Sequence, residues 1–116
     1  MLVSVCTGSW IYGHMGLLDG IAATNRKEAG AAESGPNGMS PIDRLALIAP
    51  KAKISRARVV DSGRIITGAG ITAGMEIGFH LLRRAGYNDD FIKEVARIME
   101  YSKAYDNYCN DIEYHP

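Results

Sequence analysis

The residues best suited to chemistry lie near the N-terminus, where Cys6 is followed by Thr7, Gly8 and Ser9. The preceding segment Leu2–Val5 predicts a short strand buried on both faces, since such strands show a continuous apolar run. Gly8 has no Cβ and lets the backbone turn sharply, while the hydroxyls of Thr7 and Ser9 are suited to capping a helix. The pattern predicts a nucleophile elbow with cysteine in place of serine. Its position at a helix start favours the thiolate over the thiol.

A simpler interpretation of Cys6 stays open, because free cysteine is among the residue types most often buried in protein cores. His14 lies eight residues further along the chain, about two helical turns away, and we expect it to be a surface or packing residue. Glu76 and His80 are one helical turn apart, which favours a contact on a helix face over an acid–base pair. The local pattern leaves two alternatives, a nucleophile and a buried structural thiol.

The composition excludes several classes of partner. The 116 residues carry 13 basic and 13 acidic side chains, so we expect neither a nucleic-acid partner nor an anionic membrane partner. The two cysteines, Cys6 and Cys109, have no metal-ligand spacing and form no disulfide framework, which predicts a reducing, cytoplasmic compartment. No apolar run approaches the length of a membrane span, and the N-terminus lacks the features of a signal peptide.

The remaining pattern predicts alternating helices and strands that position this cysteine. We expect Ser40 to cap the start of one helix and Asn88 or Asp89 to cap the start of the last one. Gly20 and Gly86 are expected to end two other helices. In chain order we expect a helix over 9–18, a strand over 21–24, a loop over 28–39, a helix over 41–49, a strand over 54–60 in a hairpin with 64–67, a helix over 72–85, a helix over 89–101, and a tyrosine-rich tail over 102–116 that packs by its rings or stays loose.

Several of these segments together resemble the ThiJ/PfpI superfamily. The motifs that carry the resemblance are, in chain order, Val5-Cys6-Thr7-Gly8-Ser9, Gly16-Leu17-Leu18-Asp19-Gly20, Ala23-Thr24, Ile42-Asp43-Arg44-Leu45, Arg58-Val59-Val60-Asp61, Ile65-Ile66-Thr67-Gly68-Ala69-Gly70, Ile71-Thr72-Ala73-Gly74-Met75-Glu76 and Met99-Glu100-Tyr101. The resemblance implies an α/β fold, the flavodoxin-like three-layer sandwich of class I glutamine amidotransferases. It divides the chain into residues 1–101, similar to the C-terminal half of such a domain, and the tail 102–116.

The chain departs from the superfamily in two ways. A full member has an N-terminal half that supplies an acidic partner for the cysteine and a backbone donor for an oxyanion, and the present match covers only the C-terminal part of the fold. Many relatives also have a histidine just after the Ala-Thr strand, where this sequence has Asn25 and Arg26. Without an imidazole, amide cleavage is disfavoured, and hydration or carbonyl chemistry that depends on the cysteine is favoured.

The resemblance therefore implies a cysteine-dependent lyase or hydrolase for a small molecule, of the isonitrile-hydratase-like or glyoxalase-like kind. Cys6 is the expected nucleophile and Thr7 the source of an adjacent N–H and hydroxyl, while Asn25 and Arg26 are expected to line the substrate pocket. No cofactor and no metal is implied. Two alternatives are a non-enzymatic cysteine-based stress or ligand sensor and an inactive truncated family member. The open sheet edge predicts a homodimer or a complementing N-terminal half as partner.

Overall fold

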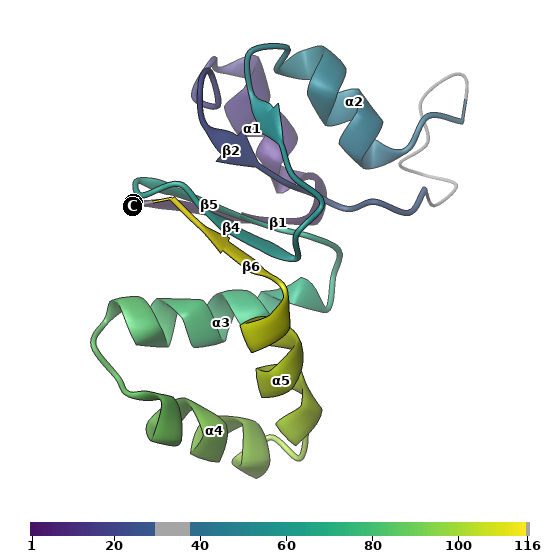
Figure 1. Ribbon diagram of the computed structural model, residues 1–116. Coiled ribbons are helices and arrows are strands. Elements are labelled where there is room, and N and C mark those ends of the chain that lie inside the picture. Colours follow the sequence, from purple (N-terminus) through teal and green to yellow (C-terminus); the bar gives the residue numbers. More distant parts are fainter. Residues whose placement is uncertain (30–37, 116) are drawn as a thin grey trace.

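A computed structural model describes residues 1–29 and 38–115 (Figure 1). The expected loop over 28–39 lies for the most part outside the described residues. The helices are a short 3-10 turn η1 (Cys6–Gly8), α1 (Ser9–His14), α2 (Pro41–Ile48), α3 (Ala73–Arg84), α4 (Asp89–Ile98) and α5 (Ser102–Asn110). The strands are β1 (Leu2–Val5), β2 (Ala22–Ala23), β3 (Lys53–Ile54), β4 (Val59–Asp61), β5 (Ile65–Gly68) and β6 (Ile112–Tyr114).

The strands of the described residues form two sheets. The larger sheet has the order β1-β5-β4-β6, in which β1 runs parallel to β5, β4 antiparallel to β5, and β6 parallel to β4. The smaller sheet pairs β2 with β3 in parallel. The chain is thus a mixed α/β protein in which parallel pairing predominates, and this coarser part of the expected fold class is confirmed.

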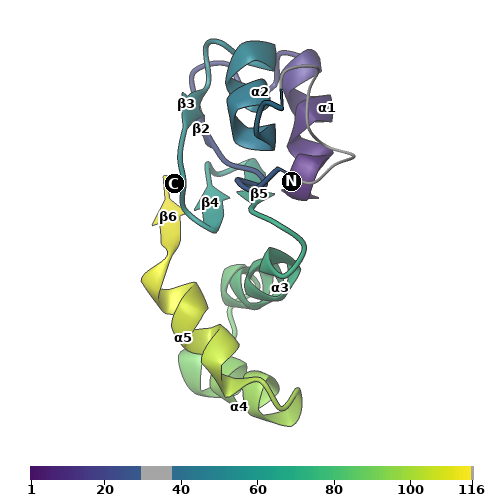
Figure 2. The same ribbon diagram turned by 90° about the vertical axis from the view of Figure 1, so that its right-hand side faces the viewer.

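Helices lie on both faces of the larger sheet (Figure 2). Helices α1 and α2 lie on one side with the β2–β3 pair, and α3 lies on the other, with α4 and α5 beyond it. Side chains alternate along a strand, so neighbouring residues of β5 point to opposite faces of the sheet. Ile65 packs with Leu45 and Ala23 on the α2 side. Ile66 packs with Ile77 of α3 on the other side. The strand therefore joins two apolar clusters.

Local signals set most helix boundaries as expected. The Oγ of Ser40 accepts a hydrogen bond from the Asp43 amide at the start of α2, and Asn88 accepts one from the Phe91 amide at the start of α4. Gly86 follows the end of α3 with φ 98°, which only glycine reaches without steric cost. The expectation that Gly20 ends the first helix was wrong: α1 ends at His14, and Gly20 lies in a later turn with φ 76°.

The segment over 54–60 forms two strands in place of the single strand that was expected. The β3 strand ends at Ile54 in the smaller sheet, and β4 begins at Val59 in the larger one. Between them the chain crosses from one sheet to the other: the Ser55 amide donates to the carbonyl of Ala23, and the Arg58 carbonyl accepts from the Ala69 amide. The alternation of side chains over 54–60 predicted extended backbone, but it could not predict that the chain passes from the smaller sheet to the larger one within this segment.

Residues 102–114 differ from the expected tail. They form α5 and then β6, which extends the larger sheet beside β4. Tyr105 and Tyr108 are buried with Phe79 of α3 and Ile92 of α4 in one apolar cluster. The aromatic rings do pack, and the segment shares a core with the two preceding helices.

Strand β1 is less buried than expected. Leu2 is exposed, Val3 and Val5 are half-buried, and only Ser4 is buried. The reason is that β1 is an edge strand, which among the described residues pairs with β5 alone. No helix in the described part of the chain has both the length and the apolar character needed to cross a membrane.

Candidate functional site

Cys6 lies at the corner between β1 and α1 with a left-handed backbone, at φ 61°. Glu100 is the only other non-glycine residue with positive φ in the described chain. Left-handed backbone costs an L-residue about 1–2 kcal/mol, because Cβ approaches the carbonyl oxygen, and such strain concentrates at functional sites. The side chain of Cys6 is half-buried. Cys6 thus stands at a sharp corner between a strand and a helix.

Contacts with the neighbouring strand hold this corner in place. The Cys6 amide donates to the carbonyl of Ala69, just after β5, over 2.7 Å. Gly8 lies against β1, where an added Cβ would be 3.4 Å from the Cβ of Ser4, an ordinary van der Waals contact. The expected capping by Thr7 or Ser9 was wrong: Gly8 is the N-cap of α1, no side chain caps that helix, and the buried Ser9 Oγ has no hydrogen-bond partner among the described residues.

Asn25 is fully buried. Its Nδ2 donates to the carbonyl of Pro41 over 3.1 Å, and the indole N–H of Trp10 donates to the same oxygen over 3.2 Å. These two bonds connect the segment after β2, and helix α1, to the start of α2. Asn25 Oδ1 is buried without a hydrogen-bond partner in the described structure. Asn25 therefore supports the region around the elbow from inside.

None of the three histidines of the chain, all of which are described, lies at the Cys6 end of the sheet. His14 is exposed on α1. His80 is buried on α3 and bonded to Asp61, and the amide of His115 donates to the Asp61 carbonyl. Asp61 pairs with Ile66 at the far end of the larger sheet from Cys6. The site therefore has no imidazole to act as a base.

A surface depression of about 490 Å³ opens at the end of the sheet where β1, β2 and β5 terminate. Its walls come from the segment after β2, from the β3–β4 connection, from the β5–α3 connection and from the start of β6. The lining residues are Arg26, Lys27, Glu28, Arg56, Arg58, Ala69, Gly70, Ile71, Thr72 and Asp111. Cys6 is not one of these lining residues, and its connection to them is the hydrogen bond from its amide to the carbonyl of Ala69. Ligands of open α/β sheets commonly bind outside the carboxyl ends of the strands.

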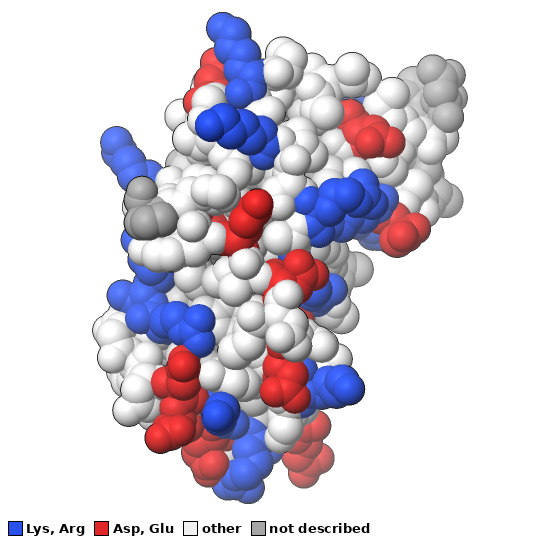
Figure 3. Space-filling view, viewed as in Figure 1, with Lys and Arg blue, Asp and Glu red and all other residues white. Residues whose placement is uncertain are grey.

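Basic side chains gather on this side of the molecule, with acidic ones beside them (Figure 3). Lys27 is half-buried in the wall of the depression, where its Nζ donates to Thr24 Oγ1 over 2.9 Å and to the carbonyl of Ala57 over 2.8 Å. The pKa of Lys27 is lowered to about 8, chiefly by burial, with Asp111 opposing the shift and the positive charges of Arg56 and Arg58 adding to it. The ammonium is therefore half-buried between two neutral oxygen acceptors, with Asp111 as the negative charge that acts on it.

The two arginines of the β3–β4 connection differ in their contacts. Arg58 makes a bidentate ion pair with the buried Glu76, at 3.2 and 3.0 Å, and also donates to Thr72 Oγ1 over 3.0 Å. Arg56 is exposed and makes neither a hydrogen bond nor an ion pair with any residue in the described ranges. Arg58 is thus fixed in direction, whereas Arg56 is available to a ligand.

A second polar cluster is buried at the opposite end of the sheet. His80 Nε2 lies 2.6 Å from Asp61 Oδ2, His80 Nδ1 lies 2.9 Å from the Tyr108 hydroxyl, and Arg84 donates to the same Asp61 oxygen over 2.6 Å. Burial raises the pKa of Asp61, and hydrogen bonds from His80, Arg84 and the Gly63 amide outweigh it, so that the pKa lies below its ordinary value. The expected contact between Glu76 and His80 was wrong, since each pairs with another strand or connection.

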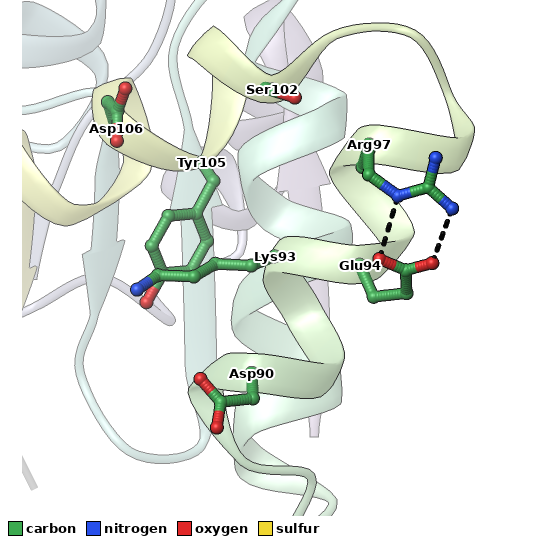
Figure 4. A pocket seen from close by; sticks show the side chains of 7 residues that line it. All are labelled: Asp90, Lys93, Glu94, Arg97, Ser102, Tyr105 and Asp106. Atoms are coloured by element: carbon green, nitrogen blue, oxygen red, sulfur yellow. Dashed lines mark hydrogen bonds and ion pairs between the residues drawn. The ribbon is translucent and has the colours of Figure 1, made fainter.

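A further depression lies between α4 and α5 (Figure 4). Arg97 makes a bidentate ion pair with Glu94 at 2.8 and 2.6 Å, and the Lys93 ammonium lies 5.5 Å from the ring centre of Tyr105. Acidic and basic side chains alternate around it, which is typical of a solvated helix surface.

Of the predicted site residues, Cys6 and Thr7 directly follow β1, Arg26 lines the depression together with Ala69, and Asn25 is buried in the interior. Lys27, Arg56 and Arg58 line the same depression and were not predicted as site residues. Their signal was the Arg26-Lys27 pair after one strand and the alternating arginines before another. The described residues contain no group of three side chains able to hold a metal ion.

The fold and this site define an α/β protein with a cysteine at a strained strand-to-helix corner. Comparison of the chain with models of known protein families and with curated proteins finds no match.

Proposed function

We propose that the chain is a ThiJ/PfpI-like protein, with flavodoxin-like layering, in which Cys6 is the nucleophile of a small-molecule hydratase or hydrolase. The observation that supports this most strongly is the left-handed backbone of Cys6, at φ 61°, between β1 and α1. A structural thiol has no need of such strain, whereas an elbow needs it to project the sulfur away from the strand. The half-buried side chain is consistent with access by a small molecule.

The lack of an imidazole at this end of the sheet favours addition chemistry over amide cleavage. With an isonitrile, the sulfur and a proton both add to the terminal carbon and form a thioformimidate. Water then adds to that carbon, the carbon–sulfur bond breaks, and a formamide and the thiol are released. Thr7, which follows Cys6 directly, would supply its N–H and hydroxyl to the developing negative charge. Neither a cofactor nor a metal takes part.

The missing imidazole also favours a second candidate, a cysteine-based sensor that reacts with oxidants or ligands without turnover. A sensor needs only an accessible, reactive sulfur. Measurement of turnover separates the enzyme from the sensor, because an enzyme converts many substrate molecules and a sensor is modified once.

The experiment uses the Cys109→Ser variant, so that Cys6 is the one thiol present, with Cys6→Ser as its matched control. Isonitriles and methylglyoxal are offered as substrates, and iodoacetamide is then added at pH 7. We expect turnover by the wild type and by Cys109→Ser, and its loss on alkylation and in Cys6→Ser. Stoichiometric reaction with peroxide without turnover would support the sensor. Equal turnover by all forms would remove Cys6 from the mechanism.

We also propose a second copy of the chain, or a complementing N-terminal half, as partner at the outer edge of β1. Within the described residues this edge pairs with no strand, and one of its carbonyls, that of Val3, accepts from the Tyr12 hydroxyl over 2.9 Å. Open strand edges are commonly covered in native proteins. Light scattering gives the mass in solution, and a monomer at micromolar concentration would contradict the dimer. Both cysteines are unpaired, which supports a cytoplasmic compartment as part of the proposal.

A further inference from the structure

Lys27 differs from every other lysine in its surroundings. It is half-buried and lines the depression that opens where β1, β2 and β5 end. The other lysines of the chain all lie within the described residues and are exposed, at positions Lys51, Lys53, Lys93 and Lys103. An exposed ammonium is solvated on most sides, whereas the side chain of Lys27 lies partly among protein atoms. Lys27 is therefore the lysine whose chemistry the fold can change.

Two hydrogen bonds fix the position of the Lys27 nitrogen. Its Nζ donates to Thr24 Oγ1 over 2.9 Å and to the carbonyl oxygen of Ala57 over 2.8 Å. Thr24 is buried, and its amide donates to the hydroxyl of Thr67 on β5, so the first acceptor is held by the sheet. Ala57 belongs to the β3–β4 connection, 30 residues from Lys27 in the chain. The amine is thus held between two segments.

The number of acceptors fits the neutral amine. An ammonium group has three N–H donors, whereas a neutral amine has two donors and a lone pair. The two neutral oxygens can take both of these donors and leave the lone pair free to attack. Burial lowers the pKa of Lys27 to about 8, with Asp111 opposing the shift and Arg56 and Arg58 adding to it. About one amine in ten is thus neutral at pH 7, against about one in three thousand for a lysine at the ordinary value of 10.5.

The depression has room for a small organic molecule beside this amine. Its volume of about 490 Å³ is within the range of small-molecule sites. Part of its lining is apolar and comes from Ala69, Gly70 and the exposed Ile71, between β5 and α3. Such a surface suits a short carbon chain, since contact removes apolar area from water. The atom that a neutral lysine amine attacks is a carbonyl carbon.

We propose that Lys27 binds a small aldehyde covalently, as an imine formed within this depression. The nitrogen lone pair adds to the carbonyl carbon, and a proton moves from nitrogen to oxygen to give a carbinolamine. The carbon–oxygen bond then breaks, the hydroxyl group leaves as water with the remaining proton of the nitrogen, and the carbon–nitrogen double bond forms. One aldehyde is taken up and one water is released, without oxidation or reduction. The reaction does not require Cys6 to be a nucleophile.

Reductive trapping with butanal tests the proposal. The protein is incubated at pH 7 with increasing concentrations of butanal and with cyanoborohydride, which reduces an imine to a stable secondary amine. Peptide mass spectrometry then measures the butylated fraction at each lysine and at the N-terminal amine, so the exposed lysines serve as internal controls. We expect the half-saturating butanal concentration at Lys27 to be at least about tenfold lower than at any exposed lysine, because more of its amine is neutral.

Lys27→Arg and Lys103→Arg form a matched pair of variants. Each keeps the positive charge, and a guanidinium stays protonated and does not form the imine. We expect the adduct formed at low butanal concentration to disappear in Lys27→Arg and to remain in Lys103→Arg, with circular dichroism to check that both variants fold. Cys6→Ser should be labelled as the wild type is, so that failure of the proposed catalysis and failure of this site are told apart.

The pH dependence gives a readout that accessibility alone would not produce. Labelling is measured relative to free Nα-acetyl-lysine in the same sample, and the ratio should be constant below about pH 8 and fall above it, because Lys27 is then already neutral. Arg56→Ala removes a positive charge and should move this fall to higher pH, whereas Asp111→Asn removes a negative charge and should move it to lower pH. The charged groups that line the depression around Lys27 are Arg26, Glu28, Arg56, Arg58 and Asp111.

Two results would overturn the proposal. One is equal labelling of Lys27 and the exposed lysines at pH 7. The other is a labelling ratio that does not fall above pH 8, which would show that the Lys27 amine behaves as a free lysine does.

Discussion

Replacing Cys6 by glycine and by alanine tests the strain at the elbow directly. Both changes remove the thiol, so the comparison between them isolates the Cβ atom. At φ 61° the Cβ of alanine costs about 1–2 kcal/mol. Glycine avoids that cost but loses about 0.5–1 kcal/mol through the greater freedom of the unfolded chain. We therefore expect Cys6→Gly to be more stable than Cys6→Ala by about 0.5–1 kcal/mol.

Thermal unfolding followed by circular dichroism can resolve a difference of this size. An unfolding entropy of about 2.1 cal/mol/K per residue gives about 0.24 kcal/mol/K for 116 residues. The expected difference in stability thus corresponds to a melting temperature about 2–4 °C higher for Cys6→Gly than for Cys6→Ala. Urea titration provides an independent value, provided that the two variants show the same dependence on denaturant.

Cys109 provides the matched control for this comparison, because it is an exposed residue of α5 with helical backbone. Glycine costs about 0.8–1 kcal/mol relative to alanine within a helix, and less near a helix end. We expect Cys109→Gly to be less stable than Cys109→Ala, the reverse of the order at Cys6. The same order at both cysteines would refute the left-handed backbone at Cys6 and, with it, the main support for the elbow.

Three further predictions concern the rest of the fold. Asp61→Ala should lower the free energy of unfolding by about 3 kcal/mol or more in urea titration, since it leaves His80 and Arg84 without their buried partner; an unchanged value would contradict the buried cluster. The pKa of Asp61 in the folded protein is lowered from 3.8, so its carboxylate stabilises the fold above pH 3.8, and this stabilisation is lost as the pH falls through the folded pKa. We therefore expect the free energy of unfolding of Asp61→Asn to depend less on pH in the acid range than that of the wild type. Gly68→Ala should lower stability by about 1–3 kcal/mol, because the new Cβ would lie 2.9 Å from Ile77 Cγ1; full stability would show that Ile77 can move aside.

The boundaries of the helices and turns were predictable because the residues that set them act locally. Ser40 and Asn88 cap the amides three residues ahead of them, and Gly86 after α3 adopts a backbone angle that other residues avoid. Cys6 belongs to the same group, since the strand before it and the glycine after it predicted a sharp turn. The sequence thus selected the residue at the strained corner without any tertiary contact.

The polar partners could not be predicted, because they are far apart in the chain. His80 lies 19 residues from Asp61 and 28 from Tyr108, and no local pattern connects them. The pairing of Arg58 with Glu76 likewise depends on how α3 packs on the sheet. Only the folded chain decides which of several compatible charges meet.

The amino-acid sequence by itself determined where this chain turns, which helices begin at which caps, and that Cys6 stands between a strand and a helix. These features follow from backbone sterics and from hydrogen bonds within a few residues. The tertiary structure decided that residues 102–114 complete the sheet with α5 and β6, that Asn25 is enclosed, and that Lys27 and Arg56 meet the start of α3 at the end of the sheet where Cys6 lies. Those outcomes depend on strand order and on packing between distant segments.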